Sequence, residues 1–222
     1  KAQFAGSGRV ARNPGGLVGL YAEENSRDSL FDAMQRREAF GTSGTRIEPR
    51  FFAGSDLPED ICQQVFVDSG YTNGVAMGSE LPAPMGSSPL FAAAASADPE
   101  GTDLQRLQII KVWHDGAGNF HQQVTDVAGD ANNGAHVELR TCGLRGQGER
   151  QLCGTWRDPD FSAEQSAAYY VRAVENPSCR WSWHQCLQLP EDQRPASCAD
   201  PSIPKTIQER AWTSAIWYSA SS

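Results

Sequence analysis

Several motifs that would identify a chemical function are missing from this sequence. It has no Cys-x-x-Cys pair, no His-x-His and no His-Glu-x-x-His, the spacings that are typical of zinc sites. No Gly-Lys-Ser/Thr occurs, so a phosphate-binding loop is absent. Residues 41–45 (GTSGT) resemble a nucleophile elbow but lack the glycine at the fifth position. The common zinc-site, nucleotide-binding and serine-hydrolase signatures are therefore not found.

Positive charge and long apolar runs are also scarce. Lysine and arginine number 19 against 27 acidic residues, which gives a net charge of -8. Nucleic acids and anionic membrane surfaces both require a basic face, so neither is an expected partner. No apolar run approaches the ~20 residues that cross a bilayer, so we expect no membrane span. The chain starts at Lys1 without an export leader, so we expect that it is processed or a fragment.

Cysteine is what the sequence has in quantity. The six cysteines are Cys62, Cys142, Cys153, Cys179, Cys186 and Cys198. An even number without metal-ligand spacing is typical of disulfides and of an oxidising compartment, so we expect a periplasmic or secreted protein. The alternative is six buried thiols in a cytosolic protein.

The cysteine positions suggest part of the pairing. Cys142 and Cys153 lie at the ends of two expected strands, so we expect a bridge between them. Two of Cys179, Cys186 and Cys198 are expected to pair, which leaves Cys62 for the third bridge. The sequence does not settle the pairing among these four.

One helix is clearly indicated. Asn25 or Ser26 can cap it with a side-chain oxygen, and apolar residues at 30, 31 and 34 form one face. We predict a helix over residues 26–39, ended by Gly41. An extended segment over residues 17–22 precedes it.

The remainder favours strands. We predict strands at 46–52, at 136–142 paired with 151–156, at 167–175 and in the aromatic tail 211–218, and a hairpin at 104–127 with its turn at 115–119. Residues 59–67 suit either a short helix or a strand. Residues 82–103, with their prolines and alanine run, are expected to be a long exposed loop, and residues 176–205 irregular.

These elements predict a mainly β protein. Short strands without a βαβ rhythm indicate an antiparallel β-sandwich-like domain. The leading strand and helix do not fit that pattern and resemble the end of a preceding domain. We therefore divide the chain into residues 1–46 and 47–222.

Two short segments are candidates for a functional site. Glu23, Glu24 and Asn25 stand where a strand gives way to a helix, a position at which barrel enzymes place working carboxylates. Helix capping is the alternative. Ser43, Thr45 and Arg46 follow the helix, and Arg46 can bind an anionic group through its planar guanidinium; a hydroxyl-stabilised turn is the alternative.

Other polar and aromatic residues have simpler interpretations. The four histidines do not make a metal set, because zinc usually takes three or four ligands. Residues 158–160 (DPD) suit a turn better than a calcium site. The tryptophans, Trp181 and Trp183 among them, are expected in packing rather than in a sugar site. We therefore assign no metal ligand in this chain.

A set of sequence blocks spanning nearly the whole chain resembles the domain-of-unknown-function 3604 family. They are 13–17 (NPGGL), 22–33 (AEENSRDSLFDA), 37–47 (REAFGTSGTRI), 103–111 (DLQRLQIIK), 155–161 (TWRDPDF), 169–172 (YYVR), 176–181 (NPSCRW) and 204–214 (PKTIQERAWTS). The chain resembles the C-terminal part of such a protein.

The resemblance implies a longer protein whose N-terminal half is similar to the polymerase-and-histidinol-phosphatase type of metal-dependent hydrolase. Residues 1–46 would then be the last strand and helix of an α/β metallohydrolase barrel, and 47–222 an accessory β domain. The divalent metals would be held by the N-terminal half, because the His-rich motifs are absent here. Glu23, Glu24 and Arg46 become candidates for the catalytic rim, and Asn25, Ser43 and Thr45 for substrate contacts.

Two functions follow as hypotheses. The first is a portion of a phosphoesterase-like hydrolase, inactive as this chain alone, whose partners are the N-terminal half and a small-molecule substrate. The alternative is a non-enzymatic β-sandwich module of the cell envelope that binds a protein or a glycan.

Overall fold

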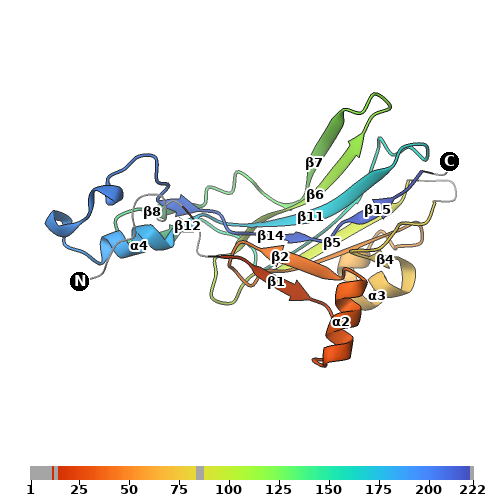
Figure 1. The fold of residues 1–222 in the computed structure, drawn as a ribbon, viewed down its shortest axis with the longest axis horizontal. Coiled ribbons are helices and arrows are strands. Elements are labelled where there is room, and N and C mark those ends of the chain that lie inside the picture. Colours follow the sequence, from red (N-terminus) through yellow and green to blue (C-terminus); the bar gives the residue numbers. More distant parts are fainter. Residues whose placement is uncertain (1–11, 13–14, 84–87, 221–222) are drawn as a thin grey trace.

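The computed structural model describes residue 12, residues 15–83 and residues 88–220. The glycines at positions 6 and 8 predict an opening loop, which lies outside this part. All paired strands run antiparallel, and three short α-helices accompany them (Figure 1). The prediction of a mainly β, antiparallel protein is therefore confirmed.

The larger sheet has seven strands in the order β1-β2-β14-β11-β6-β7, with β15 also paired to β11. Their bounds are β1 Leu17–Leu20, β2 Ala39–Thr42, β14 Arg210–Thr213, β11 Ala167–Glu175, β6 Leu104–His114, β7 Phe120–Gly129 and β15 Ile216–Tyr218. The first strands and the last strands of the chain thus meet in one sheet.

The second sheet has four strands in the order β10-β5-β3-β4. These are β10 Gln151–Arg157, β5 Leu90–Ser96, β3 Glu48–Gly54 and β4 Val75–Ala76, and the helices η1 (Ile61–Gln63) and α3 (Phe66–Asn73) accompany them. A lobe beside the sheets holds β8 (His136–Glu138) paired with β9 (Gly143–Arg145), β12 (Ser178–Cys179) paired with β13 (Thr206–Ile207), and the helices α4 (Trp181–Leu187), η2 (Glu191–Gln193) and η3 (Ala196–Cys198) (Figure 1).

The main core lies between the two sheets. Phe91 of β5 stacks on Tyr169 of β11 with ring centroids 4.2 Å apart, and both residues are buried. Phe51 of β3 and Ile109 of β6 belong to the same apolar cluster. A second cluster around Phe52 lies on the other face of the smaller sheet, where α3 covers it.

Strand β5 contradicts the prediction of an exposed loop over 82–103. It lies between β10 and β3, and its alanines are almost all buried. A strand buried on both faces shows a continuous apolar run instead of alternation. Small side chains are needed here, because Ala92 and Ala93 stand opposite Phe52 and Phe51 on β3.

Helix α2 begins as predicted but ends earlier. Ser26 is its N-cap and accepts a hydrogen bond from the Ser29 amide at 3.3 Å. The helix spans Arg27–Gln35, not 26–39, because Arg37 adopts a left-handed backbone with φ 57°. The chain turns there, and β2 starts at Ala39.

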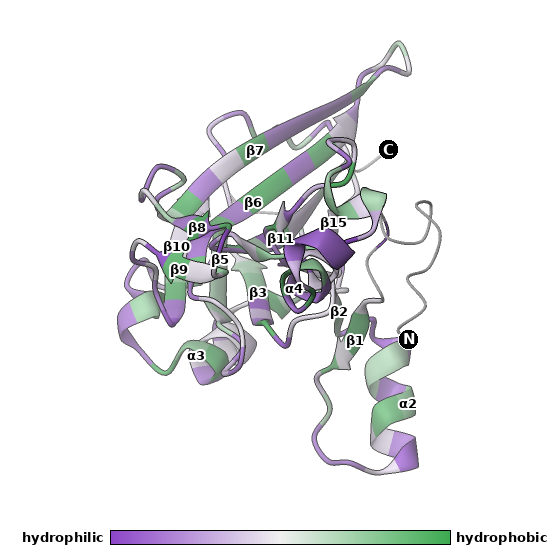
Figure 2. Ribbon diagram, turned by 90° about the vertical axis from the view of Figure 1, so that its left-hand side faces the viewer, coloured by the Kyte–Doolittle hydropathy of each residue, from purple (hydrophilic) through white to green (hydrophobic). Residues whose placement is uncertain are grey.

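The hairpin at 104–127 is confirmed. His114 stands opposite Phe120, and the Asp115 carboxylate accepts hydrogen bonds from the amides of Ala117 and Asn119 across the turn. Hydrophobic and hydrophilic residues alternate along β6 and β7 (Figure 2). The strands at 167–175 and in the C-terminal tail are also present, the latter as β14 and β15.

The structure settles three further predictions of secondary structure. Residues 59–67 form helical turns rather than a strand. The strand at 136–142 is only three residues long, and it pairs with β9 rather than with 151–156. Strand β10 pairs instead with the unpredicted β5. Residues 176–205, which were predicted to be irregular, contain α4 and the 3₁₀ turns η2 and η3.

The N-terminal strand does not form a barrel remnant in the described residues. Strand β1 pairs with β2 through residues 17–20 and 39–42, and β2 pairs with β14. Strands β1 and β2 are therefore joined by backbone hydrogen bonds to β14 near the end of the chain. The division of the chain at residue 46 stays a prediction.

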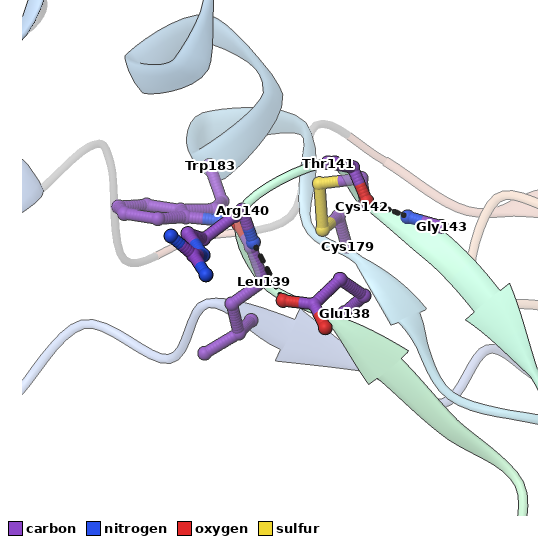
Figure 3. The surroundings of a disulfide bond; sticks show 8 residues. All are labelled: Glu138, Leu139, Arg140, Thr141, Cys142, Gly143, Cys179 and Trp183. Atoms are coloured by element: carbon purple, nitrogen blue, oxygen red, sulfur yellow. Dashed lines mark hydrogen bonds between the residues drawn. A yellow bond between two sulfur atoms is a disulfide. The ribbon is translucent and has the colours of Figure 1, made fainter.

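All six cysteines form disulfides, but the expected Cys142–Cys153 bridge is wrong. The bridges are Cys62–Cys153, Cys142–Cys179 and Cys186–Cys198, so the expected bridge within the 179–198 segment is confirmed. Cys142 lies in the turn between β8 and β9, next to β12, which carries Cys179 (Figure 3). Cys153 lies in β10 of the four-stranded sheet, and its bridge joins that strand to Cys62 of η1.

Candidate functional site

A cleft of about 970 Å³ opens between the end of β1, the end of α2 and the segment that joins α3 to β4. Several charged side chains and two tyrosines line it: Glu23, Arg36, Arg37, Glu38, Arg50, Glu80, Tyr21 and Tyr71. Clefts with a few convergent polar groups are the usual place for small-molecule binding. This cleft is therefore the candidate functional site.

Arg50 of β3 is the central cation of the cleft. Its guanidinium carbon lies 3.2 Å from the ring centroid of Tyr21, and its Nη1 donates to the Tyr71 hydroxyl at 3.3 Å. The Tyr21 hydroxyl in turn donates to the Pro49 carbonyl at 3.0 Å. Among the described residues, no carboxylate lies within ion-pair distance of Arg50. Stacking on Tyr21 fixes the plane of the guanidinium and leaves its charge uncompensated.

Glu38 is the buried acid of the same cleft. One of its oxygens accepts a hydrogen bond from the Tyr71 hydroxyl, and the other lies 3.5 Å from Arg36 Nε. Arg37 points away from this acid, because its Nε donates to the Gly78 carbonyl at 2.9 Å. Arg50, Tyr71 and Glu38 therefore form a continuous chain of polar contacts.

Both tyrosines of the cleft are neutral hydrogen-bond donors. Burial raises the pKa of Tyr21, an effect that outweighs the opposing charge of Arg50. Burial and the hydrogen bond to Glu38 raise the pKa of Tyr71. Each phenol consequently keeps its proton at neutral pH, so the cleft presents a fixed cation and neutral hydroxyls, which donate to the Pro49 carbonyl and to Glu38, rather than a phenolate.

The structure divides the site residues predicted from the sequence into two groups. Glu23 lines the cleft, whereas Glu24 lines a neighbouring hollow of about 270 Å³ beside α2. Asn25 is exposed, and Ser26, not Asn25, is the cap of α2. Ser43, Thr45 and Arg46 lie at the other end of β2, since β1 and β2 run antiparallel with Leu20 opposite Ala39.

The second group takes part in a buried polar network. The Thr45 hydroxyl lies 2.7 Å from Glu175 Oε1 and 3.1 Å from Asp98 Oδ2. The Arg46 amide donates to the same Asp98 oxygen at 2.7 Å, while the Arg46 side chain is exposed. Ser43 lies nearby and donates to Glu209.

The pKa values of the two carboxylates in this network are shifted in opposite directions. Burial raises the pKa of Glu175, and its contacts with Thr45 and Thr102 only partly offset that effect. Burial also acts to raise the pKa of Asp98, but the amides of Arg46 and Glu100 outweigh it and hold that pKa below its usual value. The Thr45 hydroxyl has a single proton for two acids, and a protonated Glu175 lets both contacts be hydrogen bonds.

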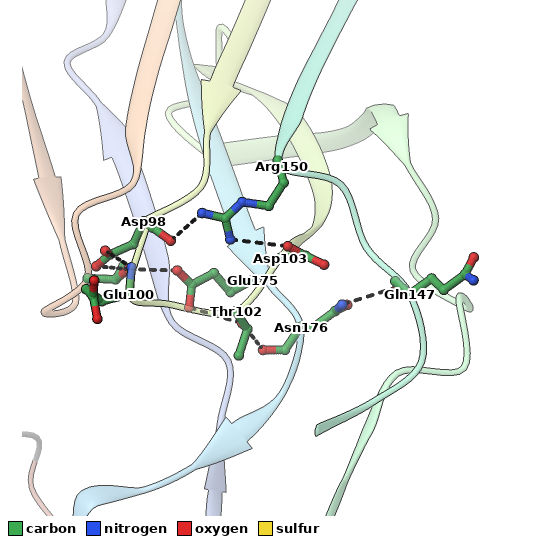
Figure 4. Close-up of polar contacts among 9 residues, drawn as sticks. Asp98, Glu100, Thr102, Asp103, Gln147, Arg150, Glu175 and Asn176 are labelled. Carbon is green, nitrogen blue, oxygen red and sulfur yellow. Dashed lines mark hydrogen bonds and ion pairs between the residues drawn. The ribbon is translucent and has the colours of Figure 1, made fainter. Parts of the chain in front are cut away.

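The network also joins distant segments. Arg150 donates to the Asp98 carbonyl at 2.9 Å and pairs with Asp103 at 3.2 Å (Figure 4). Thr102 donates to the Asn176 carbonyl at 2.9 Å. These contacts connect the ends of β5, β6 and β11 and occupy the polar groups, so this network holds the structure together rather than opening to a ligand.

Sequence reasoning missed the central residues of the cleft. Arg50 precedes Phe51 and Phe52 within one apolar strand, and Glu38 falls inside the helix predicted over residues 26–39. A lone charge inside an apolar strand is a visible signal, because burial of an isolated charge is costly. Tyr71, which lies in α3, gave no signal of its own.

The chain offers no set of residues suited to a divalent metal in its described part. The one tight group of potential ligands there is Cys142, Cys179 and His184. Both cysteines belong to one disulfide, so their sulfurs are not thiolates and do not ligate a metal. We derive no metal-dependent step from these residues.

The structure is that of a disulfide-bonded, mainly β protein with a cleft lined by charged side chains. Its three disulfides suggest an oxidising, extracytoplasmic compartment. None of the described helices is both long and apolar enough to pass through a membrane.

The chain belongs to the family described as "Protein of unknown function (DUF3604)", which matches residues 2–220. No curated protein and no solved structure matches this chain.

Proposed function

We propose that this chain is the C-terminal portion of a metal-dependent, phosphoesterase-like hydrolase, to which it contributes an accessory β domain and part of the substrate-binding rim. The resemblance of its sequence blocks to a family with a hydrolase-like N-terminal half supports the reaction class. The metals would be held by that half, and the chain alone would be inactive. The substrate is a small molecule.

Arg50 carries this proposal. It is a half-buried cation with no carboxylate of the described residues within ion-pair distance, and it is held flat on Tyr21 in a cleft that Glu23 also lines. A fixed guanidinium suits a phosphate or carboxylate group, because it donates two parallel hydrogen bonds. In this proposal Arg50 binds the anionic group of the substrate, and Tyr71, which accepts from Arg50 and donates to Glu38, holds the guanidinium in position.

The residues predicted from the sequence keep different roles in this proposal. Glu23 and Glu24 lie beside the cleft and remain candidates for orienting water or accepting a proton at the rim. Arg46, Ser43 and Thr45 lie at the far end of β2, so any catalytic contact from them requires a second surface of the N-terminal half.

Turnover by the full-length protein tests the proposal. We expect Arg50→Gln to raise KM by about tenfold or more, because a charge-assisted contact contributes about 1.5–3 kcal/mol. Glu23→Gln is expected to lower turnover without unfolding the protein. Arg145→Gln, at an exposed position outside the cleft, is the matched control. Unchanged kinetics in both Arg50→Gln and Glu23→Gln would remove the cleft from the site.

One observation favours the alternative of an envelope module that binds a glycan. A hollow of about 250 Å³ is lined by Trp113, Phe120, Trp217 and Tyr218, of which Phe120 is 90% exposed. Flat aromatic rings suit the apolar faces of sugars. Calorimetric titration of the chain with soluble oligosaccharides tests this function. Binding that Trp217→Ala abolishes would support it, and no heat from any oligosaccharide would contradict it.

The disulfides also support a location for this proposal. Within the extracytoplasmic compartments, we propose the periplasm or the exterior of the cell. A free-thiol assay on protein isolated from each cell fraction tests it: oxidised protein is expected only outside the cytoplasm.

A further inference from the structure

Three arginines gather on the outer face of the seven-stranded sheet. On the central strand β11, Arg172 is followed two residues later by Val174. Arg106 of β6 stands opposite Val174 on one side, and Arg210 of β14 stands opposite it on the other. Residues directly opposite each other in paired strands point to the same face, as do residues two apart in one strand. All three arginines therefore share one face.

That face is the one turned away from the core. Leu107, Ala173 and Ala211, the neighbours of these positions along the three strands, belong to the core cluster. Alternation then directs Arg106, Val174 and Arg210 outward. Val174 is nevertheless only 1% exposed, which is consistent with the arginine stems covering it. The three arginines thus lie around one residue, Val174.

The charges of the three arginines are not matched by acids. In the described part of the chain, no carboxylate lies within ion-pair distance of any of them. Two of them donate to neutral amides: Arg172 Nε donates to Gln108 Oε1 at 2.7 Å, and Arg106 donates to Gln105. The nearby acid Asp126 lies on β7 and accepts from Gln108 at 2.6 Å.

The arginines are close enough to act on one another. Burial lowers the pKa of Arg172, and the charges of Arg210 and Arg106 lower it further, while Tyr170 and Asp126 oppose this effect. The protein has 27 acidic residues and a net charge of -8, yet none of its described acids is paired with this cluster. Repulsion among like charges is unfavourable, and a bound anion would relieve it.

We propose that Arg106, Arg172 and Arg210 form a binding site for a tetrahedral oxyanion, the phosphate or sulfate group of a small ester. Guanidinium groups bind such tetrahedral anions through paired hydrogen bonds. Trp212 stands directly opposite Arg172 on β14 and is half-buried on the same face, so its ring offers a flat surface to the organic part of the ester. None of the three arginines lines the cleft of Arg50, and this site does not rest on the hydrolase proposal.

Calorimetric titration at about pH 8, where phosphate is a dianion, tests the site with three probes. Inorganic phosphate and inorganic sulfate test the free ion, glucose 6-phosphate tests the ester, and glucose is the uncharged comparison. We expect the charged probes to bind and glucose not to bind. Tighter binding of glucose 6-phosphate than of phosphate would identify an ester as the ligand, and equal binding would identify the free ion.

Substitutions place the binding on these residues. Arg210→Gln and Arg106→Gln are each expected to weaken phosphate binding about tenfold or more, since a hydrogen bond to a charged group contributes about 1.5–3 kcal/mol. Arg145→Gln makes the same change in net charge at an exposed position of β9 and is expected to bind like the parent. Because Arg210 is exposed, its substitution should leave the fold intact, which a thermal melt checks.

Two results would overturn the site. One is the absence of binding by all three charged probes. The other is an equal loss of affinity in Arg210→Gln and Arg145→Gln, which would mean that only net charge attracts the anion. Neither result would bear on the Arg50 cleft, because Arg50→Gln is tested by turnover in the full-length protein.

Discussion

Lys111 Nζ lies 2.5 Å from Asp158 Oδ2, and the two side chains are only 3% and 0% exposed. Lys111 also donates to the Asp160 carbonyl at 3.0 Å, and the Tyr169 hydroxyl donates to Asp158 Oδ2 at 2.8 Å. Asp158 Oδ1 meanwhile accepts from the Asp160 amide, so residues 158–160 form the predicted turn. This turn, however, is anchored in the core by a buried ion pair.

Breaking this pair from one side should be more damaging than removing both charges. We expect Lys111→Met to lower the free energy of unfolding by about 3–5 kcal/mol, because it leaves the Asp158 carboxylate buried without a cation. The double variant Lys111→Met/Asp158→Asn should recover part of that loss. Urea denaturation measures all three proteins.

The control for this prediction is an exposed ion pair. Asp103→Asn removes the partner of Arg150, whose side chain is 52% exposed, and is expected to cost about 1 kcal/mol or less. If Lys111→Met proves no more destabilising than Asp103→Asn, the buried pair contributes little and the packing of β6 against β11 explains the fold without it.

The Cys62–Cys153 bridge should be the most stabilising of the three. It closes a loop of 91 residues and ties η1 to β10, whereas Cys186–Cys198 closes one of 12. In the chain-entropy model, these loops correspond to about 4.6 and 2.8 kcal/mol. We expect Cys62→Ser/Cys153→Ser to lose more stability than Cys186→Ser/Cys198→Ser in denaturant unfolding. The reverse order would show that the loop model fails for this protein.

Glu175 should make the protein less stable as the pH rises. Its pKa is raised in the folded state by burial, so above the ordinary value of 4.5 the unfolded chain ionises more readily than the folded one. The stability that protonated Glu175 provides is full below pH 4.5 and falls as the pH increases towards neutrality. Glu175→Gln has no such dependence. The free energy of unfolding of this variant should therefore increase relative to that of the parent between pH 4.5 and about pH 7.5, as measured by urea denaturation.

The contribution of Asp98 to stability depends on pH with the opposite sign. Its pKa is held low against the effect of burial by the amides of Arg46 and Glu100, so its contribution is present above pH 3.8 and is lost on acidification. Asp98→Asn should therefore destabilise the protein at neutral pH and do so less in acid. Stability differences that do not change with pH in either variant would exclude the proposed protonation of Glu175.

The sequence was sufficient where an element follows a local rule. The hairpin of β6 and β7 has a strong strand on each side of a turn that Asp115 stabilises, and Ser26 caps α2 through its own hydroxyl. Strand β5 was missed because its alanines carry no alternation when both faces are buried. The disulfide of Cys142 was misassigned because its partner depends on which strands meet, and β8 does not pair with β10.

The candidate site was less accessible to sequence reasoning. Glu23 was found because it follows a strand, but Arg50 and Tyr71 reach the same cleft from β3 and α3. Their convergence is a property of the tertiary fold. The arginine cluster was missed for the same reason, since Arg106, Arg172 and Arg210 become neighbours only through the register of three strands.

The position of β14 has a consequence for the order in which the protein can fold. This strand lies between β2 and β11, so residues 39–42 enter the large sheet only after residues 210–213 have been synthesised. Until then, the pair of strands β1 and β2 keeps an unpaired hydrogen-bonding edge through the synthesis of the residues between them and β14. An unpaired edge is a template for pairing with another chain, so the late closure of this sheet leaves the nascent protein open to association until β14 has been made.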